Sequence, residues 1–364
     1  TNYETLLNER ILAALIEKGF SFIVPDEAHK FLCNTKNKTY KNIMALSANI
    51  ELKQILTGTP RKKSELNLYG LVTFLDRGER FGPSFYKFRE KYFQKDYMGW
   101  NYELKPEMEK EFWDKVKSCS YVVPKSVLNL PKLDRIIREV ELTGEAKKYY
   151  EIMKKDAIIE IERYKRDRLN KIVANIAIAK VTKLRQICSG FVNDTETKET
   201  IIFNQDKLLE LESILEEIDE PVIITAIYKE EILQIRKLLE KMELKFGIIA
   251  GKVSDKDREK ARVNFSENKL DVIILQEQAG GAGINKLQNY CKLMIRYSYG
   301  YSFDDDDQVI GRMERQGQKE EMRMIRLKTV LGDGKETVEQ AIIESINGKS
   351  EGFSNLVDIL TGAK

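Results

Sequence analysis

Residues 221–251, "PVIITAIYKEEILQIRKLLEKMELKFGIIAG", decide the fold class of this protein. The runs "PVIITAIY" and "KFGIIAG" are short and nearly continuous in apolar character, which is typical of strands buried on both faces of a sheet. Between them, "KEEILQIRKLLEKM" carries apolar residues at helical spacing. Two strands joined through a helix pair in parallel, because the helix returns the chain to the edge where the first strand began. The stretch therefore predicts a parallel sheet covered by helices.

The same alternation extends over residues 205–330. Helical spacing recurs in "DKLLELESILEEI" and "DREKARVNFSEN", and short apolar runs recur in "DVIILQ", "CKLMIRYSY" and "MRMIRLK". Strands that alternate with helices indicate an α/β fold with a parallel sheet and helices on both of its faces. We therefore expect residues 205–330 to form one complete lobe with a mainly parallel sheet.

The rest of the chain divides into three further segments. Residues 1–75 alternate helix and strand signals, with a helix in "TLLNERILAALIEKG" and short strands in "FSFIVP" and "KQILTGTP". Residues 76–204 are rich in aromatic and charged side chains and are expected to be a helical insertion. Its run 144–188 is long for one globular helix and is expected to break or to form a hairpin. Residues 331–364 are expected to form C-terminal helices, in "TVEQAIIESI" and "FSNLVDILTG".

Bulk properties exclude some classes of protein. The length of 364 residues favours two or three domains. Apolar runs stay well below the roughly 20 residues of a membrane span, so no membrane partner is expected. The net charge of +3 neither requires nor excludes nucleic acid. The four cysteines lack the spacing of a metal site or of a disulfide framework, so we expect an intracellular protein, cytoplasmic or nuclear.

An acid pair, Asp26 and Glu27, follows the apolar run "FSFIVP", and two positions later comes His29, the single histidine of the chain. Ligands of open parallel sheets bind at the carboxyl ends of strands. In phosphate-loop enzymes an aspartate at such a position holds magnesium, and a neighbouring carboxylate can orient the attacking water. Taken by itself, "DEAH" is equally compatible with an ordinary turn at the end of a strand.

Two later segments also carry candidate site residues. "LQEQAGGAGIN" follows a strand, and its glycines let the backbone approach a ligand closely. In "DQVIGRMERQGQ", Arg312 and Arg315 are three positions apart, so on a helix they share a face suited to bidentate phosphate contact. They could instead pair with surface acids, because "FDDDD" at 303–307 is close in sequence. Those aspartates are interpreted as a helix N-terminal cap with favourable dipole placement.

The ordered set of motifs resembles that of the Swi/Snf-type ATPases of helicase superfamily two. The set comprises "DEAH", "LTGTP", a helical insertion, "LRQIC", "AGGAGIN" and "QVIGRMERQGQ", in that order. The resemblance spans nearly the whole chain. It implies two RecA-like lobes with parallel sheets, a helical insertion and C-terminal helices. It also implies an ATP-driven motor that moves along double-stranded DNA, usually without separating the strands.

The resemblance implies roles for residues of the first lobe. Asp26 would bind Mg²⁺ and Glu27 would polarise the attacking water. His29 would contribute to the cofactor site and link it to the surface between the lobes. The coupling of the two lobes would fall to three neighbours, Thr57, Gly58 and Thr59.

The resemblance also implies roles in the second lobe. Gly281 and Gly283 would lie beside ATP. Gln308, Arg312 and Arg315 would close on the nucleotide, the arginines as fingers. Gly251 and Lys252 would lie near the DNA backbone. The chain departs from the family at Gln276 and Glu277, where Ser-Thr is frequent.

A phosphate loop requires Gly-x-x-x-x-Gly-Lys-Ser/Thr between a strand and a helix. The one Gly-Lys-Ser in the chain is 348–350, and the residue five positions before Gly348 is Ile343, so the loop pattern is absent there. In the family this loop precedes the segment that resembles "TNYE". We therefore expect the chain to be a fragment whose first lobe is truncated, and whose own ATPase activity is weak.

Two other functions fit the same residues. The chain could be a non-hydrolysing DNA-binding or scaffold protein built on the same lobes, or a superfamily-two enzyme that acts on RNA. Stimulation of ATP hydrolysis by duplex DNA, and not by RNA, would distinguish the motor from the enzyme that acts on RNA. The sequence indicates no particular protein partner.

Overall fold

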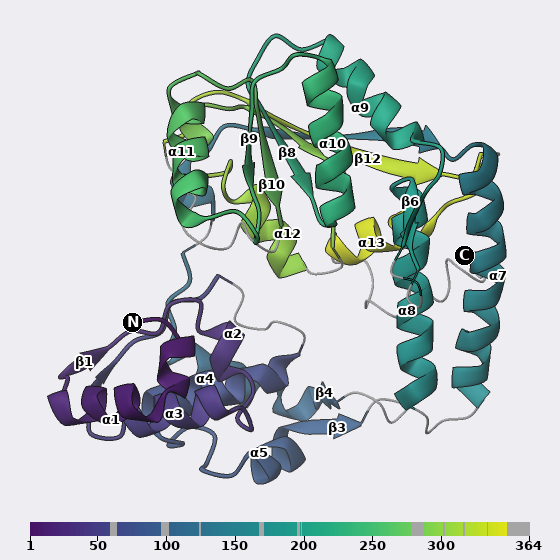
Figure 1. The fold of residues 1–364 in the computed structure, drawn as a ribbon. Coiled ribbons are helices and arrows are strands. Elements are labelled where there is room, and N and C mark those ends of the chain that lie inside the picture. The colour runs from purple at the N-terminus through teal and green to yellow at the C-terminus, as the bar shows by residue number, and fades with distance from the viewer. Residues whose placement is uncertain are drawn as a thin grey trace. The chain divides into compact units, whose positions relative to one another are not determined.

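The computed structural model of the chain divides into two compact units, Thr1–Pro124 and Lys125–Lys364 (Figure 1). Each unit is described by itself. The structure describes residues 1–58, 64–95, 102–123, 125–166, 171–194, 197, 199–277, 287–300, 303–315, 317–332 and 334–347. Within these ranges, every helix is too short or too polar to cross a membrane.

The second unit is built on a six-stranded sheet in the order β5-β12-β11-β8-β10-β9. All five pairings between neighbouring strands are parallel. The strands are β5 (Leu133–Glu141), β8 (Val222–Ala226), β9 (Phe246–Ile249), β10 (Val272–Gln276), β11 (Leu293–Arg296) and β12 (Met322–Val330). The parallel sheet predicted for residues 205–330 is confirmed. Every residue of the central strands β8, β10 and β11 is buried, which explains their continuous apolar runs.

Helices cover both faces of this sheet (Figure 1). They are α9 (Asp206–Glu216), α10 (Lys229–Lys241), α11 (Asp255–Ser266) and α12 (Phe303–Ile310). Successive strand residues point to opposite faces. Ile224 therefore packs with α9 and α10 in one core, whereas its neighbour Ile223 packs with α11 and α12 in the other. This two-sided burial is the α/β architecture expected from the sequence.

The segment predicted to be a helical insertion, residues 76–204, contains strands as well as helices. Residues 144–188 form the expected hairpin of α7 (Gly144–Arg166) and α8 (Lys171–Cys188). The hairpin is followed by two short antiparallel strands, β6 (Phe191–Asn193) and β7 (Thr200–Ile202). The region before the hairpin differs from expectation, because β5 joins the main sheet as its edge strand through parallel pairing with β12. The sequence does not reveal β5, because an edge strand is half solvated and its Ile136 and Ile137 are exposed.

A C-terminal helix packs against the α7–α8 hairpin within the second unit. Helix α13 (Val338–Ile346), predicted from "TVEQAIIESI", packs Val338 and Ala341 into the core formed by α7 and α8. The Tyr150 hydroxyl of α7 accepts the backbone N–H of Val338 at 2.7 Å, which satisfies a donor at the start of α13. The other predicted helix, "FSNLVDILTG", lies outside the described residues.

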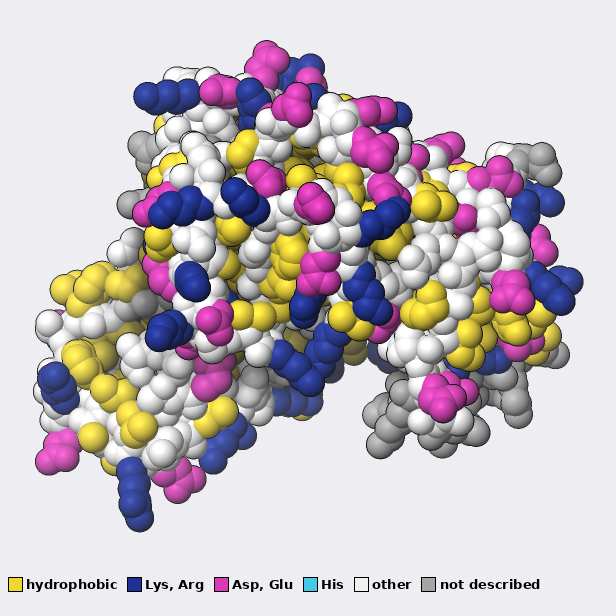
Figure 2. Space-filling view, turned by 45° about the horizontal axis from the view of Figure 1, so that its top comes forward, with side chains coloured by type: hydrophobic (Ala, Val, Ile, Leu, Met, Phe, Trp, Pro, Cys, Tyr) yellow, Lys and Arg dark blue, Asp and Glu magenta, His cyan; other side chains and the backbone are white. Residues whose placement is uncertain are grey.

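The first unit contains one parallel pair of strands among short helices. Strand β1 (Phe22–Ile23) pairs with β2 (Leu52–Lys53) in parallel, as predicted. The helices are η1 (Glu4–Leu7), α1 (Glu9–Lys18), α2 (His29–Leu32), α3 (Lys38–Leu46), η2 (Glu65–Asn67), α4 (Leu68–Asp76), α5 (Phe85–Tyr92), η3 (Pro106–Met108) and α6 (Glu109–Lys117). Apolar side chains gather on the visible face of this unit in Figure 2. Phe22 and Leu52 contribute exposed apolar surface, with exposed fractions of 49% and 64%.

An aromatic cluster belongs to the core of the first unit. Phe81 packs against Phe88 and Phe112 with ring centroids 4.8 and 5.2 Å apart, and these rings share one core with α2, α3 and α4. The antiparallel strands β3 (Phe93–Lys95) and β4 (Tyr102–Leu104) follow α5. Buried aromatic side chains dominate core energetics. The segment around α5 and α6 is therefore part of the first unit, whereas the sequence placed it in the insertion.

Candidate functional site

The predicted acid pair lies in a turn directly after β1. Asp26 is exposed, and its carboxylate accepts the backbone N–H of Glu27 at 2.9 Å. Glu27 has a positive φ of 47°, a conformation that residues other than glycine seldom adopt. Backbone strain of this kind concentrates at functional sites, where surrounding contacts hold it in place. The turn thus places both acids at the carboxyl end of a parallel strand.

Tyr3 supports the acid turn from an earlier part of the chain. Its hydroxyl donates a hydrogen bond to the backbone oxygen of Asp26, and its ring stacks on Phe31 with centroids 3.8 Å apart. Burial, followed by the negative charges of Asp26 and Glu27, raises the pKa of Tyr3 to about 12. The hydroxyl therefore stays protonated and able to donate at neutral pH. Local sequence patterns could not reveal a contact between residues 23 positions apart.

His29 connects the acid turn to the segment that contains Thr57. Its side chain is 1% exposed, and Nδ1 lies 2.9 Å from Thr57 Oγ1 and 3.4 Å from the Glu27 carboxylate. The backbone N–H of Ala28 also donates to the carbonyl of Leu56 at 3.0 Å, which extends the pairing of the two segments beyond β1 and β2. The imidazole therefore lies between a predicted catalytic acid and a predicted coupling residue.

Three predicted site residues, Thr59, Gly281 and Gly283, lie outside the described residues. Gly58 is described and is exposed in a bend directly after Thr57. Its backbone is therefore open to solvent, while the Thr57 side chain is held by His29.

The predicted DNA-side loop begins at Gly251, after β9. Its backbone N–H donates to Gln276 Oε1 at 3.1 Å, and Gln276 Nε2 donates to the carbonyl of Ile227 at 3.1 Å. Gln276 ends β10, so its amide joins the carboxyl ends of three neighbouring strands. Lys252, the next residue in the loop, is exposed. Sequence reasoning noted Gln276 only as a departure from the family, because its partners lie 25 and 49 positions away.

The segment with the predicted fingers does not form the expected helix. Helix α12 contains Gln308 but ends at Ile310, so Arg312 and Arg315 lie in the turn that follows it. Arg312 is half-buried and Arg315 is exposed. Burial, followed by repulsion from Arg315, lowers the pKa of the Arg312 guanidinium. A bound anion would relieve this repulsion, because charge-assisted contacts to a phosphate favour the charged form of arginine.

The interpretation of "FDDDD" as a cap with favourable dipole placement is wrong for Asp306. Its side chain is buried and forms ion pairs with Arg296 of β11 at 3.0 Å and with Arg326 of β12 at 2.8 Å. The sequence could not reveal this, since two strands distant in sequence must come together beside α12. Glu277, the other departure from the family, is likewise buried and pairs with Arg296. It therefore points into its own unit and away from solvent.

The side chains that could hold Mg²⁺ are identified by their oxygen donors. Among the described residues, no group of three or more His, Cys, Asp or Glu side chains is arranged to hold a metal ion. Mg²⁺ in nucleotide sites usually takes one or two protein carboxylates and completes its shell with phosphates and water. Asp26 fits this mode of binding, because its carboxylate is exposed at the end of a strand.

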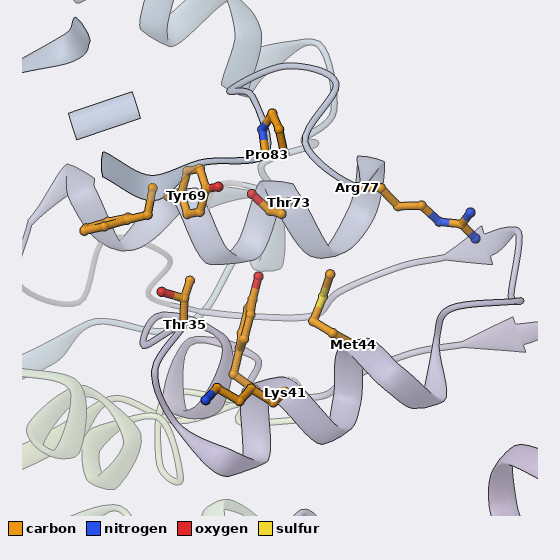
Figure 3. Close-up of a pocket in the computed structure, with 9 residues that line it drawn as sticks. Thr35, Lys41, Met44, Tyr69, Thr73, Arg77 and Pro83 are labelled. Carbon is orange, nitrogen blue, oxygen red and sulfur yellow. The ribbon is translucent and has the colours of Figure 1, made fainter. Parts of the chain in front are cut away.

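A separate hollow lies between α3 and α4 of the first unit (Figure 3). Its volume is about 480 Å³. Thr73 and Tyr69 line it from α4, and Met44 and Lys41 line it from α3. None of the described site residues predicted from the sequence lines this hollow. It is therefore distinct from the acid turn and from the loops of the second unit.

Two protein families match the chain. Residues 1–191 match the SNF2-related domain, and residues 204–317 match the helicase conserved C-terminal domain. The first match includes the acid turn and the segment from β2 to Thr57. The second match includes the residues from Gly251 to Arg315.

Three relatives to which the chain is similar are longer than the chain itself. Protein CHROMATIN REMODELING 5 of Arabidopsis thaliana is 25% identical over 96% of the chain, and the chain spans 20% of its length. Protein p41 of Acyrthosiphon pisum secondary endosymbiont phage 1 is 23% identical over 91% of the chain, which spans 70% of it. The ATP-dependent helicase YqhH of Bacillus subtilis is 26% identical over 94% of the chain, which spans 61% of it.

Proposed function

The chain belongs to the SNF2-related family, and on that premise we propose that it is part of a DNA-dependent ATPase that moves along duplex DNA. The observation that carries the proposal is the hydrogen bond between buried His29 and Thr57. It joins the acid turn, where hydrolysis is expected, to the segment expected to couple hydrolysis to movement. An ordinary solvated turn at the end of a strand does not require a buried imidazole between these two segments.

The acid turn is proposed to act on ATP and water. Asp26 would hold Mg²⁺, which supplies charge neutralisation for the phosphates. Glu27 would orient the attacking water and accept its proton, because a carboxylate beside the metal ligand is the usual general base in such sites. Tyr3 and His29 would keep the turn in its strained conformation, since both contact it directly.

The second unit is proposed to supply positive charge to the phosphate undergoing transfer. Arg312 and Arg315 would stabilise the negative charge that develops on the equatorial oxygens, as arginine fingers do. Gln308, on the last turns of α12, would contact the nucleotide. Burial, followed by the positive charge of Arg315, lowers the pKa of Arg312, and this supports the assignment, because a bound anion beside Arg312 would favour its charged form.

The loop after β9 is proposed to contact the DNA backbone. Lys252 is exposed beside Gly251 and could neutralise a phosphate, and the backbone of a glycine permits close approach. The name of the plant relative, which refers to chromatin remodeling, supports DNA as the substrate, and the name of the bacterial relative, an ATP-dependent helicase, supports the use of ATP. The protein is proposed to act inside the cell, where both ATP and DNA are found.

The test is ATP hydrolysis by the full-length protein with duplex DNA, with duplex RNA and with neither. Duplex DNA should stimulate the rate and RNA should not, and Glu27→Gln should abolish the stimulated rate. Glu17→Gln, a change at an exposed position of α1, is the matched control and should leave the rate unchanged. DNA binding without hydrolysis would favour the scaffold, and stimulation by RNA alone would favour an RNA enzyme.

A further inference from the structure

Four charged side chains are buried together at the carboxyl edge of the second unit's sheet. Glu277 directly follows β10, Arg296 ends β11, Asp306 lies in α12 and Arg326 lies in β12. Each side chain is at most 5% exposed. The proposed function uses none of them. Burying charges is costly unless they are paired, so their arrangement requires an explanation.

The four charges alternate in sign along a continuous chain of contacts. Arg296 pairs with Glu277 and also lies 3.0 Å from Asp306 Oδ1. Arg326 Nη2 donates to Asp306 Oδ2 at 2.8 Å. The formal charges of the four side chains cancel, and Asp306 is the one acid that contacts both arginines. Displacing α12 from the sheet would therefore separate Asp306 from two buried cations.

This chain of charges connects two segments that carry predicted site residues. Glu277 directly precedes the segment 278–286, which contains the glycines predicted to lie beside the nucleotide. Asp306 lies two positions before Gln308, on the helix that leads into the turn with Arg312 and Arg315. The charge network therefore links the end of β10 to α12.

We propose that Asp306 is a positioning residue, which holds α12 against the sheet so that Gln308 and the two arginines that follow it keep their place relative to the carboxyl ends of β10 and β11. The inference rests on the proposed ATPase function and adds to it. Buried ion pairs contribute little net stability compared with apolar residues of equal size, and their best-attested use is to specify one arrangement among alternatives. Here the specified arrangement is that of α12, β11 and the end of β10.

A second buried ion pair in the same unit provides a control. Lys207 of α9 and Glu339 of α13 are 2.6 Å apart, and their side chains are 1% and 4% exposed. Neither α9 nor α13 carries a predicted site residue. Loss of this pair should therefore destabilise the unit without displacing the nucleotide residues.

The experiment compares Asp306→Asn, Glu277→Gln and Glu339→Gln in the full-length protein. All three remove a buried negative charge with little change in shape. For each, kcat and KM for ATP are measured with saturating duplex DNA, together with DNA affinity and stability to denaturant. Asp306→Asn should lower kcat about 100-fold and leave KM nearly unchanged. The expected loss is this large because a misplacement of reacting groups by roughly 1 Å costs about 100-fold in rate. Glu277→Gln should act in the same direction, whereas Glu339→Gln should lose stability but keep kcat.

Two results would overturn the inference: a folded Asp306→Asn protein with the kcat of the wild type, or an equal loss of kcat in Glu339→Gln at matched stability. If Asp306→Asn does not fold, Arg326→Lys keeps the positive charge opposite Asp306 and should still lower kcat at unchanged KM. An unchanged kcat in that variant would also overturn the inference. A wild-type protein without DNA-stimulated hydrolysis would overturn the proposed function itself, and the inference with it.

Discussion

His29 Nδ1 and Thr57 Oγ1 lie 2.9 Å apart, although the residues are 28 positions apart in sequence. The contact joins the turn after β1 to the segment after β2 through the buried side chain of His29. In the proposed motor, this hydrogen bond links the hydrolytic acids to the element that couples the lobes.

Thr57→Val should weaken that link while preserving the shape of the side chain. Loss of a buried hydrogen bond should cost about 1–3 kcal/mol of stability. DNA-stimulated hydrolysis should fall more than basal hydrolysis, because the variant affects coupling more than chemistry. Thr200→Val is the control: it removes a hydrogen bond of 2.9 Å to Asn193 on an exposed strand and should change neither rate. Equal losses of basal and stimulated rate in Thr57→Val would contradict a coupling role.

Arg315→Ala should abolish ATP hydrolysis while leaving DNA affinity largely intact. Removal of an arginine finger usually costs about 10³–10⁵ in rate, because positive charge is lost where the transition state is negative. The control is Arg262→Ala, which removes a guanidinium that pairs with Glu259 on its own helix. Steady-state ATPase rates and DNA titrations would be measured for both. A near wild-type rate in Arg315→Ala would show that this residue is not a finger.

Lys252→Ala and Gln276→Ala should weaken DNA binding in different ways. Loss of one lysine–phosphate contact should reduce the slope of log affinity against log salt by about 1. Gln276→Ala removes no charge, so the slope should stay the same while affinity falls, because the backbone of Gly251 is no longer held. Titrations of each variant with one DNA duplex at several salt concentrations measure both the affinity and the slope. An unchanged slope in Lys252→Ala would place this lysine away from the DNA backbone.

Lys207→Met should strongly destabilise the second unit, because it leaves the buried Glu339 carboxylate without its ion-pair partner. Breaking a buried pair in this way typically costs about 3–5 kcal/mol. Lys241→Met breaks an exposed pair with Glu212 and should cost only about 0–1 kcal/mol. Denaturant unfolding of both variants provides the comparison, and similar losses would contradict the difference in burial.

Glu111 should contribute stability that depends on pH. Hydrogen bonds from Lys91 and Tyr92 lower the pKa of its carboxyl from 4.5 to about 2. A carboxyl whose pKa is lower in the folded state stabilises the protein above its unfolded pKa, and this stabilisation is lost as pH falls toward the folded pKa. Glu111→Gln should therefore be less stable than the wild type at neutral pH, and the difference should shrink between pH 4.5 and about 2.

Denaturant unfolding across this pH range measures the effect. Glu109→Gln, a change at an exposed position of the same helix, is the control and should show little difference from the wild type. A Glu111→Gln difference that stays constant with pH would contradict the assignment to this carboxyl.

The sequence by itself determined the fold class and most of the elements. Short apolar runs between amphipathic helices predict a doubly covered parallel sheet, because a residue's neighbours along the chain reveal which faces of its element are buried. The apolar pattern of the local sequence indicates the buried faces of β8, β10 and α10 in this way, and all three elements lie where they were expected. The acid turn was predicted for the same reason, since it directly follows an apolar strand.

Only the tertiary structure decided which distant residues meet. The edge strand β5 is half solvated, so it lacks the continuous apolar run of a central strand. Its pairing with β12 is what shows it to be a strand of the main sheet. Asp306 looks like a helix cap in sequence, but Arg296 and Arg326 reach it from strands 10 and 20 positions away. Arg312 and Arg315 have helical spacing, yet α12 ends before them. Local periodicity determines the buried face of an element, whereas the partners of a charge depend on how the elements pack.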